Sequence, residues 1–535
     1  MKAKSDKSFE LYRKKLIEKE KNDVSVKRES MLNIALVFPN DYSVGMANLG
    51  FQTVYRLFNE LDSISCERSF YYKEFPNITK TLESGRELRD FDIVAFSVSF
   101  ELDIPNLVQV LINAGIEPRT EKRHSREPLV VCGGAVTFIN PAPLEIFTDF
   151  MVVGEIEPQF KRFANLLLEK RIKGYTKSEL SNMLAEVPGI FVPLLKNLEE
   201  PIKNEILPGK ISSPQHSVII SPNSHFKNMF LIEVGRGCGR RCNFCAASHI
   251  YHPFRYFAPE QILAAIQNKS PDTKRIGLIG SAISDYPTIP ELCERLVNHG
   301  YELGLSSFRL DRITPSFLQI LEKGKVKSVT FAPEAGSERL RKIINKGLSH
   351  EAIISSANFI ADSNINQIKL YFLIGLPGEE DSDINGIANL ITEIHQVFFE
   401  KKVKKTITVS VNGFIPKPWT PFQWAKMETP NEIRRKRKML ATKIKSYPNV
   451  IINKKSIKEE MLQGVISLGD NNVGQAIYLK IKNKIDWAEA WREAGVNVDN
   501  LLYNEKTFDL KFPWESISVG IKKKILWQKW EASKK

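Results

Sequence analysis

The chain has 535 residues, of which 42% are hydrophobic and 26% charged, a balance typical of globular proteins and unlike that of disordered or collagen-like chains. It contains no run of about 18 apolar residues, which predicts that no segment spans a membrane. The N-terminus is rich in Lys and Glu and lacks the apolar core of a secretory signal, which predicts a cytoplasmic protein.

The net charge of +14 is concentrated at the two ends of the chain. Residues 1–30 carry +4 and residues 431–535 carry +10, while the stretch between them is balanced. A basic end beside a neutral body attracts polyanions, so an RNA or ribosomal substrate is one interpretation. An ordinary solvated, lysine-rich surface is the other, and the sequence leaves both open.

Residues 1–30 predict a charged, helical N-terminal extension with few apolar positions. From residue 31 to residue 175, short apolar runs alternate with helical patterns, which predicts a doubly wound parallel α/β sheet. The runs are residues 32–39, 92–97, 128–134 and 150–155. Ligands of such a sheet bind beyond the carboxyl ends of its strands. These ends lie at residues 40–45, 97–99, 133–134 and 154–155.

Residues 176–225 contain one short helical pattern followed by scattered prolines, which predicts a linker. Residues 226–425 then contain six strand-like runs, each except the last followed by a helical pattern. The runs are residues 229–234, 275–280, 303–307, 328–332, 367–374 and 406–411. Six such units fit an incomplete (β/α)6 barrel, whose site gathers the loops at the carboxyl ends of the strands. Residues 426–535 predict a basic, α-rich C-terminal region.

A loop after the first strand of this barrel contains Cys238, Cys242 and Cys245 in the spacing Cys-x3-Cys-x2-Cys. Thiolates hold iron–sulfur clusters, and the usual [4Fe–4S] cluster takes four of them. Three cysteines would leave one iron free to bind another molecule. A zinc site is the alternative, and it would need His249 and His252 because no second Cys-x-x-Cys arm exists. Glycines at positions 235, 237 and 239 favour a tight loop around a cluster over three unrelated buried thiols.

This cysteine spacing, with Phe244 directly before the third cysteine, resembles the radical S-adenosylmethionine (SAM) enzymes. The stretches Pro333-Glu334-Ala335-Gly336-Ser337 and Ile374-Gly375-Leu376-Pro377-Gly378-Glu379 extend the resemblance along residues 226–425. The resemblance implies a [4Fe–4S] cluster whose free iron binds the amino and carboxylate groups of SAM. It also implies a one-electron reductant, such as flavodoxin or ferredoxin, and cleavage of SAM to a 5′-deoxyadenosyl radical.

The same resemblance implies which loops contact SAM. The residues expected there are Phe244, Gly280, Ser281, Ser306, Arg309, Glu334 and Gly375. Gly280 and Ser281 are expected near the SAM amino group, and Arg309 is expected to pair with the SAM carboxylate. Glu334 is expected to accept hydrogen bonds from the ribose, and Gly375 to let the adenine lie against its strand. The sequence does not identify the catalytic residues.

The first α/β unit resembles the cobalamin-binding domains that precede many radical SAM cores. In that family a loop of the form Asp-x-His-x-x-Gly supplies a histidine to the cobalt. The matching stretch here is Asn40-Asp41-Tyr42-Ser43-Val44-Gly45, with Tyr42 in place of the histidine. A neutral phenol is a poorer cobalt ligand than imidazole. Cobalamin without a protein axial ligand, cobalamin with a different ligand, and an empty scaffold therefore all stay open.

Two further segments have two interpretations each. Residues 412–424 form a stiff, aromatic stretch that could wall the barrel or pack against another domain. Lys522, Lys523 and Lys524 lie beside Trp527 and Trp530, an arrangement that fits both nucleic-acid stacking and a helix docked through its tryptophans.

The main functional prediction is a radical SAM enzyme of unknown substrate, with methylation, methylthiolation or rearrangement as its outcome. Methyl transfer to RNA or protein is favoured if cobalamin binds. Methylthiolation ranks lower, because such enzymes are expected to carry a second cysteine cluster and only Cys66 and Cys132 precede the barrel. The alternative is an RNA- or ribosome-associated iron–sulfur protein that does not cleave SAM.

Overall fold

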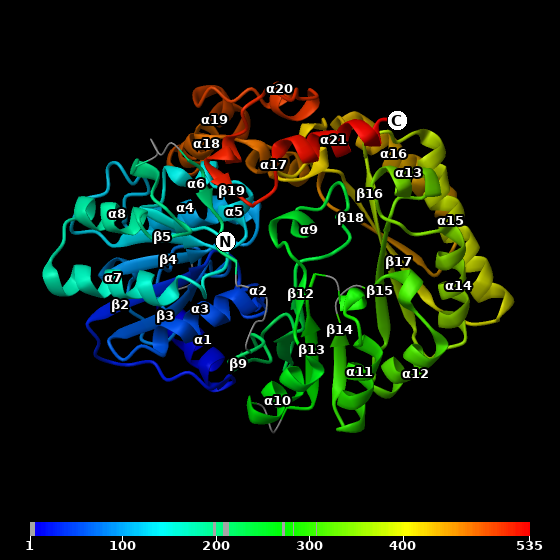
Figure 1. Ribbon diagram of the computed structural model, residues 1–535, viewed down its shortest axis with the longest axis horizontal. Helices are drawn as coiled ribbons and strands as arrows, with labels where there is room; N and C mark the ends of the chain where they lie inside the picture. The colour runs from blue at the N-terminus through cyan, green and yellow to red at the C-terminus, as the bar shows by residue number, and fades with distance from the viewer. Residues whose placement is uncertain (1–5, 196–199, 207–212, 270–272, 282, 306–307) are drawn as a thin grey trace.

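The computed structural model describes residues 6–195, 200–206, 213–269, 273–281, 283–305 and 308–535. Two α/β lobes lie side by side, and the C-terminal helices lie across the top of both (Figure 1). No helix in these described ranges is both long and apolar enough to cross a membrane.

The N-terminal lobe contains a six-stranded sheet in the order β3-β2-β4-β5-β6-β7, parallel except for its last pair. Its strands are β2 (Leu32–Phe38), β3 (Ile64–Phe70), β4 (Ile93–Ser97), β5 (Leu129–Gly133), β6 (Phe150–Val152) and β7 (Ile190–Phe191). Its helices are α2 (Tyr42–Gly45), α3 (Leu49–Asn59), α4 (Ile104–Asn113), α5 (Val136–Ile139), α6 (Ala142–Glu145), α7 (Phe160–Lys173) and α8 (Lys177–Ala185). The apolar strands are buried because helices cover both faces of the sheet. The doubly wound sheet is confirmed, with β3 and β7 as strands that the sequence reading missed.

The second lobe is a partial barrel of seven parallel strands in two adjoining sheets, β10-β13-β14 and β15-β16-β17-β18. Its strands are β10 (Phe230–Glu233), β13 (Arg275–Ile279), β14 (Glu302–Leu305), β15 (Ser328–Glu334), β16 (Gln367–Ile374), β17 (Thr406–Gly413) and β18 (Val450–Lys454). Its helices are α10 (Pro259–Lys269), α11 (Ile289–Asn298), α12 (Pro315–Lys323), α13 (Glu338–Ile343), α14 (His350–Ala361), α15 (Asp381–Glu400) and α16 (Pro430–Ile444). The incomplete barrel is confirmed. Helix α16 and strand β18 extend it by one unit into the region expected to be α-rich.

Short elements connect the lobes. Helix α1 (Asp6–Glu18) packs on the N-terminal lobe through the buried side chains of Phe9 and Leu16. The two-stranded pairs are β1 (Lys21–Asn22) with β9 (Ile219–Ile220), β8 (Ile202–Lys203) with β19 (Ile517–Ser518), and β11 (Gly235–Arg236) with β12 (Arg255–Tyr256). Helix α9 (Ala247–Ile250) lies between β11 and β12.

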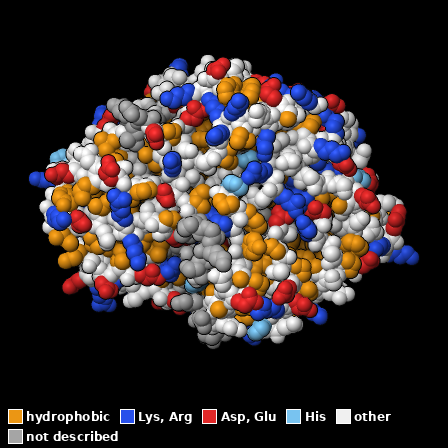
Figure 2. Space-filling model, viewed as in Figure 1, with side chains coloured by type: hydrophobic (Ala, Val, Ile, Leu, Met, Phe, Trp, Pro, Cys, Tyr) orange, Lys and Arg blue, Asp and Glu red, His pale blue; other side chains and the backbone are white. Residues whose placement is uncertain are grey.

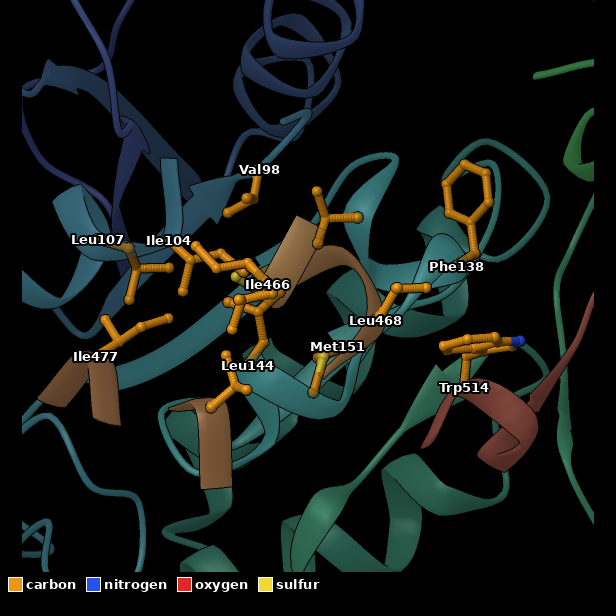
Figure 3. Packing of buried hydrophobic residues seen from close by; sticks show 14 of the residues in the cluster. Val98, Ile104, Leu107, Phe138, Leu144, Met151, Ile466, Leu468, Ile477 and Trp514 are labelled. Atoms are coloured by element: carbon orange, nitrogen blue, oxygen red, sulfur yellow. The ribbon is translucent and has the colours of Figure 1, made fainter. Parts of the chain in front are cut away.

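The C-terminal helices share one hydrophobic core with the N-terminal lobe. They are α17 (Ile457–Leu468), α18 (Asn471–Asn483), α19 (Trp487–Glu493), α20 (Val498–Tyr503) and α21 (Lys523–Ser533). Figure 3 shows Ile466, Leu468 and Ile477 of α17 and α18 among Leu107 and Leu144 of the N-terminal lobe. A Cβ atom at Gly474 would lie 2.6 Å from the carbonyl oxygen of Pro143, so this glycine allows α18 to approach α6 closely.

The aromatic segment at residues 412–424 is packed inside the molecule. Phe422 and Trp424 are fully buried, and the ring of Phe422 lies 5.6 Å from that of Trp530 on α21. The indole nitrogen of Trp419 donates a hydrogen bond to the carbonyl oxygen of Ile139, 3.1 Å away in the N-terminal lobe. This segment and α21 therefore join the two lobes, and Trp530 serves as a docking anchor.

Candidate functional site

The loop that contains the three cysteines begins at the carboxyl end of β10 and is framed by the β11–β12 pair. Gly237 has φ +79°, and a Cβ atom there would lie 2.0 Å from the carbonyl oxygen of Tyr251. Both the left-handed backbone and this close approach exclude other residues. Gly239 has neither constraint, because a Cβ atom there would meet nothing within 4 Å.

Asn243 fastens the loop to two other parts of the barrel. Its side-chain nitrogen donates to the carbonyl oxygen of Ile343 at 2.8 Å, and its backbone nitrogen donates to that of Ile344 at 3.0 Å. Its own carbonyl oxygen accepts from the backbone nitrogen of Phe422 at 3.0 Å. Phe244 is half-buried and packs against the hydrophobic core that contains Phe422. The loop is therefore held by α13 and by the segment before α16.

The three thiols are close enough for their charges to influence one another. Burial raises the pKa of Cys242 to about 11, and the neighbouring Cys245 and Cys238 add to this rise. Among the residues that the structure describes, no three His, Cys, Asp or Glu side chains lie close enough together to hold a single metal ion. Around one zinc ion, thiolate sulfurs would be roughly 3.8 Å apart. A cubane cluster instead binds each thiolate through a different iron, and three cysteines in one loop match that donor set.

The two histidines of the zinc alternative have other partners. His249 is buried, its Nε2 atom lies 3.2 Å from the carbonyl oxygen of Cys242, and burial lowers its pKa to about 4. The Nε2 atom of His252 lies 3.0 Å from a guanidinium nitrogen of Arg241. The Nε2 atoms of both histidines are therefore engaged within the protein.

Two of the residues expected to contact SAM, Gly280 and Glu334, lie near the cysteine loop. Gly280 approaches it closely, since a Cβ atom there would lie 3.2 Å from the carbonyl oxygen of Gly235. Glu334 ends β15 with a strained φ of +68°, and its carboxylate lies 3.4 Å from the ammonium of Lys346. Burial raises the pKa of Glu334. Strain of this kind concentrates where a side chain must be aimed at a ligand.

The further residues expected to contact SAM are Arg309, Gly375 and Ser306. The guanidinium of Arg309 donates to Asp311 at 2.8 and 2.9 Å and to the carbonyl oxygens of Lys346 and Gly347. Four of its five N–H donors are thus engaged within the protein. Gly375 has φ +81°, and its missing Cβ faces Glu428. Ser306 lies outside the described residues.

A cavity of about 570 Å³ extends between the lobes, next to the cysteine loop. On the barrel side it is lined by Arg236, Gly237, Gly280 and Ser281, among other residues. On the other side it reaches the carboxyl ends of β4, β5 and β6 and continues as an apolar slot between the sheet and helices α3 and α7. The lining there includes Ser97, Ser99, Gly133, Gly134, Gly154, Val54, Phe58, Phe163 and Leu167. Three of the four strand ends expected to bind a ligand thus line one cavity.

Tyr42 is not among the residues that line this cavity. Its hydroxyl donates to Glu20 at 2.6 Å, and its ring packs against Phe70. Burial raises the pKa of this phenol, so it stays neutral. The side chain at the expected cobalt-ligand position therefore points into the N-terminal lobe instead of the cavity.

Sequence reasoning included Glu155 only as part of a strand end, and it missed three other charged residues that line the cavity between the lobes, namely Glu157, Glu233 and Arg236. The available signals were two acids directly after a strand, in Gly154-Glu155-Ile156-Glu157, and an arginine between two glycines before the first cysteine. The role of these charged residues depends on the contact between the two lobes, which the sequence does not reveal.

Two family models match the chain. One, described as radical SAM proteins, N-terminal, matches residues 50–193, and one for the radical SAM superfamily matches residues 232–391. Together they span more than half of the sequence and include the cysteine loop and the strand ends around it. The chain belongs to the radical SAM superfamily. Membership implies an enzyme that uses a [4Fe–4S] cluster and SAM and that needs a reductant.

Relatives of this radical SAM protein include an uncharacterized protein of Methanocaldococcus jannaschii, 27% identical over 83% of this chain and 90% of that protein. The ribosomal protein uS12 methylthiotransferase RimO of Moorella thermoacetica is 26% identical over 35% of this chain and 47% of its own length. Among solved structures, the radical SAM methyltransferase TsrM of Kitasatospora setae is 14% identical, with a TM-score of 0.49 over 73% of this chain and 75% of TsrM.

Proposed function

We propose that Cys238, Cys242 and Cys245 hold the [4Fe–4S] cluster with which this radical SAM enzyme cleaves SAM. The observation that carries this assignment is the position of the loop at the carboxyl end of β10, beside Gly280 and close to Glu334. When bound, the cluster supplies the electron that cleaves SAM to methionine and a 5′-deoxyadenosyl radical. A cytoplasmic location suits such an oxygen-sensitive centre.

The protein's contribution is to bind and orient SAM at the open side of this loop. Ser281 and the backbone at Gly280 face the cavity, where they can receive the amino acid end of SAM. Glu334 can accept hydrogen bonds from ribose hydroxyls if the ammonium of Lys346 moves away from its carboxylate. The backbone at Gly375 is assigned to the adenine. Arg309 reaches the SAM carboxylate only if its contact with Asp311 is exchanged. The assignment of Ser306 and Phe244 to the SAM site stays a prediction from the sequence.

We further propose that the cavity between the lobes binds cobalamin and that the reaction is methyl transfer. The cavity combines an apolar slot inside the N-terminal lobe with a polar mouth beside the cluster loop, which suits a large ligand with a buried tail and an exposed reactive face. The solved relatives include TsrM with cobalamin and a cluster bound. When bound, the corrinoid supplies a carrier for the methyl group. Tyr42 does not line the cavity, which supports binding without a protein axial ligand at that position.

For the substrate, we propose an RNA or ribosomal protein. Support comes from RimO, whose name states a ribosomal protein substrate, and from the basic ends of the chain. The structure weakens the support from the basic ends of the chain. In the basic run of α16, Lys436 pairs with Glu379 at 2.9 Å and Arg437 pairs with Glu460 at 2.6 Å, so these two charges are neutralised inside the molecule. On the face shown in Figure 2, Lys and Arg are interspersed with Asp and Glu.

The substrate proposal is tested with SAM whose methyl group carries deuterium. The reconstituted enzyme, cobalamin and a reductant are incubated with RNA and ribosomes from a deletion strain, and the products are analysed by mass spectrometry. We expect deuterated methyl groups at one site that is unmodified in the deletion strain. Equal labelling with and without enzyme would reject the proposed substrate class while leaving SAM cleavage to its own test.

A further inference from the structure

One guanidinium lies where the two lobes and the cysteine loop meet. Arg236 lies on β11 and precedes Cys238 by two residues. Its Nε atom donates to Glu233 on β10 at 2.6 Å, its Nη2 atom donates to Glu157 at 2.6 Å, and its Nη1 atom lies 3.1 Å from Glu155. Glu155 and Glu157 belong to the N-terminal lobe, so Arg236 joins three carboxylates from two lobes.

A second arginine shares one of these carboxylates. Arg255 stands directly opposite Arg236 in the antiparallel β11–β12 pair, so both side chains project from the same face. The carboxylate of Glu155 binds Arg255 at 2.6 and 3.0 Å while also contacting Arg236. All of these side chains are at most 15% exposed. We call these five residues, Glu155, Glu157, Glu233, Arg236 and Arg255, the interlobe ion cluster.

The β11–β12 pair encloses the whole cysteine loop, from residue 237 to residue 254. Two like charges directly opposite each other destabilise such a pair unless an opposite charge lies between them. The charge that lies between Arg236 and Arg255 is Glu155 of the N-terminal lobe. The frame of the cysteine loop is therefore stabilised by the docking of the other lobe, at the edge of the cavity between the lobes.

We propose that the interlobe ion cluster sets the position of the cysteine loop relative to the cavity between the lobes, with Arg236 as the positioning residue. The proposal rests on the proposed function only where it concerns the ligand of that cavity. A ligand that binds there and fixes the N-terminal lobe also fixes the hairpin around the cysteine loop. Occupation of the cavity and the geometry of the cluster are then coupled through Arg236.

Lysine tests this role because it keeps the positive charge but cannot contact three carboxylates with one planar fork. Arg240 provides a matched control, since it follows Cys238 by two residues and pairs with Asp285 within the barrel, its Nε atom donating to the carboxylate oxygens at 2.9 and 3.0 Å. Arg236→Lys and Arg240→Lys thus perturb the two sides of one cysteine, but only Arg236→Lys perturbs the contact between the lobes. Glu157→Gln weakens one contact of Arg236 and serves as a milder variant if Arg236→Lys fails to fold.

The first measurement is hydrogen–deuterium exchange of the full-length protein without cobalamin. We expect at least tenfold faster exchange in Arg236→Lys for peptides spanning residues 153–157 and 233–237, and no change there in Arg240→Lys. Equal exchange in wild type and Arg236→Lys would overturn the proposal. This readout involves neither SAM nor a corrinoid, so it separates failure of the proposal from failure of the proposed function.

The second measurement is the electron paramagnetic resonance (EPR) spectrum of the reduced cluster with and without added cobalamin. Wild type and Arg240→Lys should show a change in the cluster spectrum on addition of cobalamin. Arg236→Lys should assemble the cluster, lose this change and bind cobalamin at least tenfold more weakly. An unaltered response and affinity in Arg236→Lys would contradict the coupling. If wild type binds no cobalamin, the corrinoid part of the proposed function fails, and the exchange measurement alone decides the proposal.

Discussion

At the scale of single residues, the two glycines that flank Cys238 are in opposite situations. Gly237 has a left-handed backbone and lies against the Tyr251 carbonyl, whereas Gly239 has open space around its Cα atom. A methyl group at position 237 must displace the backbone of the cysteine loop. The same methyl group at position 239 meets nothing.

We therefore predict that Gly237→Ala prevents assembly of the cluster and that Gly239→Ala does not. The measurement is the iron and sulfide content of each variant after anaerobic reconstitution. Gly239→Ala should retain the wild-type content of about four irons per chain, and Gly237→Ala should lose most of it. Equal contents would mean that the tight turn at Gly237 is not needed to hold the cluster.

Glu334 supplies the second prediction at this scale. If its carboxylate accepts hydrogen bonds from the ribose of SAM, Glu334→Gln loses a charged acceptor, which is worth about 1.5–3 kcal/mol. We predict that the dissociation constant for SAM rises by about 10-fold or more. Glu338→Gln is the control, because Glu338 is exposed at the start of α13 and should leave binding unchanged. Equal affinities measured by titration calorimetry would remove Glu334 from the SAM site.

Some single residues of the candidate site could be predicted from the sequence, and others could not. The positions of the cysteines and of Glu334 at strand ends could be predicted because each has a recognisable strand and a short-range pattern, and their roles toward the cluster and SAM stay predictions. Arg309 shows the limit, because its partners Lys346 and Gly347 lie on a later loop that no local pattern identifies. Its role toward SAM stays a prediction.

At the scale of elements, helix α16 shows how a basic run is used inside a fold. Arg437 and Glu460 are both buried, and a guanidinium nitrogen of Arg437 also donates to the carbonyl oxygen of Val411 at 3.1 Å. These contacts tie α16 to β17 and α17. The basic run therefore contributes to the packing of the barrel as well as to its charge.

We predict that Arg437→Met lowers the free energy of unfolding by about 3 kcal/mol or more, because it leaves the buried carboxylate of Glu460 without its cation. Arg434→Met is the matched control on the exposed side of the same helix and should change the free energy by about 0.5 kcal/mol or less. Urea denaturation provides both values. A similar loss in both variants would show that the Arg437–Glu460 pair has no special role.

Strands β3 and β18 explain why part of the fold escaped prediction. The sequence of β3, Ile-Ser-Cys-Glu-Arg-Ser-Phe, has the polarity of an exposed segment, yet all seven residues are buried. Arg68 is buried there because Glu20 and Glu83 neutralise it from 48 and 15 residues away. Strand β18 is a short run after a strongly basic helix, and its assignment depends on pairing with β17. Patterns within one segment do not contain such partners.

At the scale of the whole molecule, the cysteine loop and the cavity are brought together by the lobes and by the C-terminal helices that join them (Figure 1). No histidine is among the described residues that line the cavity, and the Tyr42 hydroxyl is bonded to Glu20 elsewhere in the N-terminal lobe. We predict that bound cob(II)alamin shows no nitrogen hyperfine splitting from a histidine in its EPR spectrum. Triplet splitting that persists with a corrinoid lacking its own base would contradict this arrangement.

The central claim is that the loop from Cys238 to Cys245 cleaves SAM, and formation of 5′-deoxyadenosine tests it most directly. The full-length protein is reconstituted anaerobically, reduced with dithionite in the presence of SAM, and analysed by liquid chromatography and mass spectrometry. We predict that wild type and Cys293→Ala, which alters a buried thiol on α11, form 5′-deoxyadenosine. Each Cys→Ala variant at positions 238, 242 and 245 should form none. An intact cluster without 5′-deoxyadenosine in wild type, or continued formation in the three loop variants, would contradict the account.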